Sequence, residues 1–144
     1  MASRFRREQL HHVQLVQITA FDANGQVALD TMRALSTRLF AAGIRVFIPC
    51  AGSSEFHSLM ADEIVSTIKS LRDALGPEPV IMAPVGLQPR YAAELGQRSL
   101  DAGADAVLVM PLYQKMGDDG FFLGHEIPSP LFRLGAWVGS LWRS

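Results

Sequence analysis

The stretch 48–59, IPCAGSSEFHSL, places several chemically capable side chains directly after a short apolar run. Ser53 and Ser54 offer hydroxyl groups beside Gly52, and Glu55 adds a carboxylate. Small hydroxyl residues at the end of a buried strand suit two roles. One is chemistry or ligand binding at the strand end. The other is a tight turn in which Ser53 or Ser54 caps the next helix.

Cys50 and His57 are the groups in this stretch with the chemistry of a nucleophile or a base. A lone histidine in a loop is ordinarily a surface or packing residue. Cys50 has apolar neighbours, a pattern typical of a buried, inert thiol. A structural role is therefore favoured over a catalytic one for both residues.

Four short apolar runs alternate with three helical patterns, and these elements must position the loop. The runs have the length and β-branched content of strands, mostly buried on both faces. The third helical pattern begins with Pro89 and ends before Gly103. Proline is common in the first turn of a helix, and glycine is common directly after the last. The predicted strands cover 13–20, 45–51, 79–85 and 105–112, and the predicted helices cover 27–42, 61–75 and 89–102.

This alternation predicts an α/β protein with parallel strands and right-handed crossovers. A weak internal repeat supports it, since 41–49 and 101–111 share the order helix end, Ala-Gly, apolar strand, proline. A doubly wound sheet and a (β/α) barrel both fit the pattern. No G-x-G-x-x-G follows the first strand, which weakens a dinucleotide-binding interpretation.

Composition excludes several classes of protein. The 144 residues are 49% hydrophobic with a net charge of -1, so we expect a globular domain that binds no nucleic acid. No apolar run approaches the roughly 20 residues that span a bilayer, and the N-terminus lacks the apolar core of a secretory signal. One cysteine excludes an internal disulfide and is typical of a cytoplasmic protein.

Three motifs in order and spacing resemble the dihydrodipicolinate synthase and N-acetylneuraminate lyase family. They are ITAFDANGQVALD (18–30), PCAGSSEFHSL (49–59) and APVGLQPRYAAELGQRSLDAGADAVLVMPLYQ (83–114). The resemblance covers about residues 13–124, roughly the N-terminal half of a (β/α)8 TIM barrel. It implies Schiff-base lyase chemistry on pyruvate-type keto acids, no cofactor and no metal, and self-association, since family members are homo-oligomers.

The resemblance also implies roles for particular residues. Gly52, Ser53 and Ser54 match the motif that binds the carboxylate of the keto acid, and backbone N–H groups suit an anion because they are pre-oriented. Glu55 matches an acid that hydrogen-bonds the loop backbone. Tyr113 matches the catalytic tyrosine that relays protons at the Schiff base, a role for which a phenol can both donate and accept.

The chain departs from the synthase pattern at two loops. Gly52 stands where synthases carry a relay threonine, and Leu87-Gln88 replaces a tyrosine after the third strand. The resemblance therefore favours an aldolase or dehydratase acting on a sugar-derived keto acid.

The Schiff-base lysine belongs at the end of a sixth strand, and this chain offers only Lys69, in a predicted helix, and Lys115. We therefore expect a chain that is inactive alone. We divide it into an N-terminal extension (1–12), a partial barrel (13–124) and an atypical tail (125–144). The tail has no acidic residue after Glu126, which suggests a frame-shifted or truncated segment, with a partner-binding tail as the alternative.

Two other functions stay open. One is a non-catalytic fragment or carboxylate-binding module, and the other is a flavodoxin-like domain, although only Asp22 stands near the end of the first strand. For a half-barrel, we expect exposed strand edges and an inner sheet face formed by Phe47, Ile81 and Val107 or by their alternate neighbours.

Overall fold

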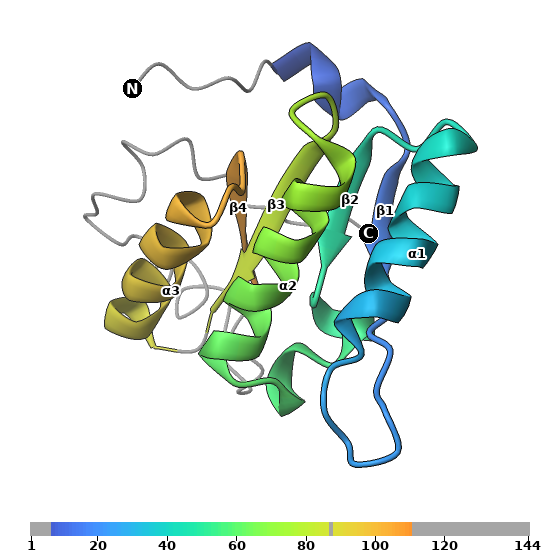
Figure 1. The fold of residues 1–144 in the computed structure, drawn as a ribbon. Coiled ribbons are helices and arrows are strands. Elements are labelled where there is room, and N and C mark those ends of the chain that lie inside the picture. The colour runs from blue at the N-terminus through green and yellow to red at the C-terminus, as the bar shows by residue number, and fades with distance from the viewer. Residues whose placement is uncertain (1–6, 87, 111–144) are drawn as a thin grey trace, which may run out of the picture.

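The computed structural model describes residues 7–86 and 88–110 as four strands with three α-helices between them (Figure 1). Three short 3-10 helices accompany them. The strands are β1 (Gln14–Gln17), β2 (Val46–Pro49), β3 (Val80–Val85) and β4 (Ala106–Val109). The helices are η1 (Arg7–His11), α1 (Leu29–Ala41), η2 (Gly52–Ser54), η3 (Phe56–Ser58), α2 (Ala61–Leu75) and α3 (Pro89–Asp101).

The four strands form one parallel sheet in the order β1-β2-β3-β4. All three α-helices lie on the same face of that sheet (Figure 1). A doubly wound sheet reverses its strand order at a switch point and carries helices on both faces. Consecutive order with helices on one face is instead the arrangement of a (β/α) barrel wall, as predicted.

The helix-facing side of the sheet forms the larger core. Ile81 and Val107 pack there with Ile64, Ile68 and Leu71 of α2, all nearly inaccessible to solvent. Burying each of these side chains contributes about 1.5–3 kcal/mol. This packing explains why the apolar residues of α2 recur at helical spacing.

The opposite face of the sheet carries a second cluster formed by the alternate strand residues. They are Val46, Ile48, Val80, Met82 and Ala106, with Leu10 of η1 against them. Of the two predictions for the inner face, the alternate neighbours are therefore correct. Phe47, Ile81 and Val107 were the wrong set, because Ile81 and Val107 belong to the helix-facing core and Phe47 lies in register with Ile81.

The predicted element bounds agree closely for the helices and less well for β1. The helix predicted over 61–75 has those bounds, whereas the first strand, predicted over 13–20, ends at Gln17. The chain leaves the sheet there and folds into a loop closed by an antiparallel bridge between Phe21 and Val27. Asp22 Oδ1 accepts hydrogen bonds from the backbone N–H groups of Asn24 and Gln26, at 2.8 and 2.9 Å.

Candidate functional site

The loops after β1 and β2 lie together at the carboxyl end of the sheet, at the lower edge of Figure 1. Parallel strands bring all their carboxyl ends to one edge, and barrel enzymes build their active sites there. The stretch singled out in the sequence is thus at the end of the molecule where chemistry is expected.

The loop after β2 is bounded by two residues in the left-handed region. Cys50 has φ 61° and Glu55 has φ 66°, and η2 lies between them. Such a conformation in a residue other than glycine costs of order 1–3 kcal/mol, and it persists only where surrounding contacts impose it. Within the loop, Ala51 O accepts from Ser54 N at 2.8 Å and from Phe56 N at 3.2 Å.

The three residues predicted to bind a carboxylate differ in accessibility. Ser53 is exposed and Gly52 is half-buried, so both can face a ligand. Ser54 is only 1% exposed, and its Oγ donates to Gln17 O at 2.5 Å. Thr19 Oγ1 in turn donates to Ser54 O at 2.7 Å. The structure therefore brings the three together, with the Ser54 hydroxyl bonded to the end of β1.

The alternative in which Ser53 or Ser54 caps the next α-helix is not what the structure shows. Helix α2 begins at Ala61, and its N-terminus is capped by Glu63, whose Oε2 accepts from Met60 N at 2.8 Å. The two serines instead belong to η2, and η3 separates them from the start of α2.

Glu55 and His57 lie on the surface of the loop. Glu55 Oε2 accepts a hydrogen bond from Ser58 Oγ at 3.1 Å. The partner is thus a side chain of the same loop, whereas we expected the loop backbone. The His57 ring packs against Phe56 in an edge contact, with centroids 5.3 Å apart. Both side chains therefore make contacts within the loop itself.

Cys50 is fully buried, as its apolar neighbours predicted. Burial raises the pKa of its thiol from 9.0 to about 11, although the hydroxyls of Thr67 and Thr19 oppose the increase. At neutral pH the sulfur is therefore a thiol rather than the thiolate that nucleophilic catalysis requires.

Gly86 marks a close approach that sequence reasoning missed. A Cβ placed on it would lie 3.0 Å from Met110 Cβ and 3.3 Å from Phe56 Cε1. Glycine at this position lets the end of β3 approach both the β2 loop and the residue after β4. Its place directly after a buried strand was the signal available in the sequence.

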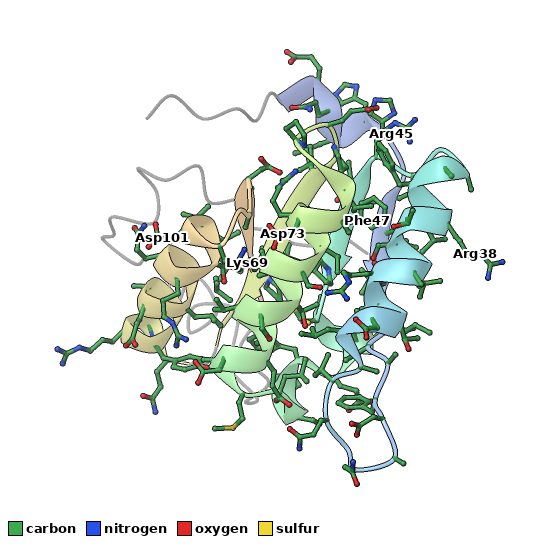
Figure 2. The ribbon with its side chains drawn as sticks, viewed as in Figure 1. Arg38, Arg45, Phe47, Lys69, Asp73 and Asp101 are labelled. Carbon is green, nitrogen blue, oxygen red and sulfur yellow. The ribbon has the colours of Figure 1, made fainter. Side chains whose placement is uncertain are left out.

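Tyr113 and Lys115 lie outside the described residues. Lys69 projects from the outer face of α2, with its side chain 65% exposed and its Nζ 2.8 Å from Asp73 Oδ2 (Figure 2). Its exposure agrees with the expectation that it faces solvent.

Within residues 7–86 and 88–110, no three His, Cys, Asp or Glu side chains gather as a metal site would require. Nor is any helix of this part of the chain long and apolar enough to cross a bilayer.

A one-sided α/β layer whose loops gather at the carboxyl ends of parallel strands defines part of a (β/α)-barrel protein. The model of the "Dihydrodipicolinate synthetase family" matches residues 9–122, and the chain belongs to that family.

The relatives of this chain are named for two different activities. A 4-hydroxy-tetrahydrodipicolinate synthase of Haloarcula marismortui is 33% identical over 112 residues, 77% of this chain and 37% of that protein. A probable 5-dehydro-4-deoxyglucarate dehydratase of Streptomyces griseus is 31% identical over 109 residues, 75% of this chain and 34% of the relative. The chain thus spans less than half the length of either.

Solved structures agree with the fold. The crystal structure of dihydrodipicolinate synthase from Bacillus clausii matches 88% of this chain and 41% of its own, with a TM-score of 0.75 and 26% identity. The described strands and helices therefore correspond to one contiguous part of such a barrel.

Proposed function

We propose that this chain supplies the carboxylate-binding part of a Schiff-base lyase that acts on pyruvate-type or sugar-derived keto acids. The observation that carries the proposal is the β2 loop. It presents Gly52 and the exposed Ser53 at the carboxyl end of the sheet, on a backbone held in an uncommon conformation. Pre-oriented backbone N–H groups stabilise an anion with little reorganisation.

Gly52 favours an aldolase or dehydratase over a synthase. The position carries no side chain and therefore offers no hydroxyl for the synthase relay. The relatives include both a synthase, at 33% identity, and a probable dehydratase, at 31%, so this choice rests on Gly52. In this proposal Tyr113 relays protons at the reacting carbon, as the family resemblance implies.

The proposal includes no imine formation by these 144 residues alone. A Schiff-base lysine must lose its proton, commonly through burial, and Lys69 is exposed and paired with Asp73. Borohydride treatment with pyruvate or a sugar-derived keto acid, followed by intact mass measurement, should give no stoichiometric adduct. An adduct localised to Lys69 or Lys115 would contradict this part of the proposal.

Carboxylate binding is tested separately by titrating the labelled protein with pyruvate while recording amide chemical shifts. The amides of Gly52 and Ser53 should respond first, and Ser53→Ala should weaken binding. Thr37→Val, on the exposed side of α1, serves as the control. A response confined to distant amides would show that the loop is not the site.

The proposal also includes self-association and a cytoplasmic location. Within residues 7–86 and 88–110, no strand pairs with the outer side of β1, and Val13 and Ile18, which flank it, are 69% and 65% exposed; this edge supports self-association. The free Cys50 thiol supports a cytoplasmic location.

The second candidate function is a carboxylate-binding module without catalysis. It uses the same loop, and the exposure of Lys69 favours it.

A further inference from the structure

The geometry points to Thr19 and Ser54 as positioning residues that hold the carboxylate-binding loop in its binding conformation. This inference rests on the proposed function and assigns a role that the family motif alone does not. Ser54 acts through its own bonds to β1 rather than by contact with substrate.

The first step concerns where the hydroxyl groups point. Ser54 Oγ donates to Gln17 O at 2.5 Å, and Thr19 Oγ1 donates to Ser54 O at 2.7 Å. A serine hydroxyl has one proton to donate, and that of Ser54 is already used. With 1% of the residue exposed, Ser54 has no free donor to offer a ligand.

These two hydrogen bonds connect Ser54 to the last residue of β1, Gln17, and to Thr19, which follows the strand. The carbonyl of Ser54 is held by Thr19, and its hydroxyl is held by the backbone of Gln17. Because Ser54 is followed by the left-handed residue Glu55, fixing it on two sides restrains the backbone through the strained turn.

Gln17, which accepts the bond from Ser54, is itself held in the core. It is 1% exposed, and its Nε2 donates to Met32 O of α1 at 3.4 Å. The Gln17 Oε1 atom lies 2.9 Å from Ser36 Oγ of α1, whose single proton is also within reach of Met32 O at 2.7 Å. Hydrogen bonds therefore connect the loop after β2 to Gln17 of β1, and Gln17 to α1.

The decisive variant is Thr19→Val, which keeps the β-branched shape and removes the hydroxyl. Losing one hydrogen bond of this kind shifts a local equilibrium about 5- to 10-fold. We expect hydrogen exchange at the amides of Ser54 and Phe56, both bonded to Ala51 O, to speed up by about that factor. Pyruvate binding should weaken to a similar degree.

Two matched variants separate positioning from general packing. Thr37→Val removes a hydroxyl that donates to Arg33 O on the surface of α1, and it should alter neither exchange in the loop nor binding. Thr19→Ser retains the hydroxyl and should restore both. Ser53→Ala should weaken binding without changing exchange at Ser54, as expected of a ligand contact.

Each outcome decides one of the two proposals. If wild-type protein fails to bind pyruvate, the proposed function fails, while exchange in Thr19→Val still tests the positioning role. If Thr19→Val leaves loop exchange unchanged, or if Thr19→Ser behaves like Thr19→Val, the inference is overturned. Should Thr19→Val unfold the chain, Ser54→Ala is measured in its place with the same readouts.

Discussion

Arg72 of α2 and Asp105, directly before β4, form an ion pair that is largely sheltered from water. Arg72 Nη2 lies 2.5 Å from Asp105 Oδ2, and the side chains are 17% and 15% exposed. The same guanidinium donates to the carbonyl oxygens of Gly103, Gly76 and Pro79. Asp105 Oδ2 also accepts from Ile81 N at 2.8 Å, so the pair joins α2, β3 and β4.

We expect Arg72→Met to destabilise the protein by about 3–5 kcal/mol, because it leaves the carboxylate of Asp105 buried without its partner. Denaturant unfolding measures the change. Lys69→Met is the matched control, since it breaks an exposed pair on the same helix and should cost only about 0.3–0.5 kcal/mol. Equal losses in the two variants would show that burial does not govern this pair.

Gly103→Ala tests the packing around the same arginine. Gly103 has φ 110°, and a Cβ there would lie 2.7 Å from Arg72 Cγ. Gly43 has a similar φ of 103°, and a Cβ added to it would meet no atom within 4 Å, so Gly43→Ala measures backbone strain alone. Gly103→Ala should therefore be the more destabilising of the two, by about 1–3 kcal/mol of overpacking. Thermal unfolding of both variants measures the difference, and equal shifts in Tm would exclude a clash at Gly103.

Cys50 predicts a pH dependence of stability at alkaline pH. Its folded pKa is raised to about 11 from 9.0, so the buried thiol contributes fully below pH 9 and loses its contribution as pH rises toward 11. This shift corresponds to roughly 3 kcal/mol. The stability of wild-type protein should therefore fall relative to Cys50→Ala across this range, and a constant difference would contradict the assignment. A thiol reagent at pH 8 should modify the native protein far more slowly than the unfolded chain.

Among the described strands, β1 lies at an edge of the sheet with no strand paired to its outer side, and this edge predicts self-association. An unpaired strand edge flanked by apolar side chains is a template for pairing with another chain. We expect sedimentation at micromolar concentration to show oligomers of the wild-type chain and fewer of the double variant Val13→Lys/Ile18→Lys. Met60→Lys, also at an exposed apolar residue (71%), controls for added charge away from β1. A wild-type monomer with cooperative unfolding would refute the prediction.

Local patterns in the sequence were enough to predict the elements and the fold class. The helix over 61–75 was predicted with its observed bounds because apolar residues three and four apart reflect burial of one face of a helix. The four apolar runs predicted buried strands, and their alternation with helices predicted that these strands are parallel. The end of β1 was misjudged because Ile18 and Ala20 continue the apolar run, although the chain leaves the sheet after Gln17.

Only the tertiary structure decided how those elements face one another. A strand buried on both sides shows no alternation in its sequence, so nothing local distinguished Ile81 and Val107 from Val80 and Ala106. The family motif grouped Ser54 with Ser53, but its hydroxyl is bonded to a carbonyl 37 residues earlier in the chain. Gly86 likewise acquires its meaning from Met110 and Phe56, neighbours in space rather than in sequence. Residue spacing records local periodicity, whereas these contacts exist only once distant strands have been brought into register.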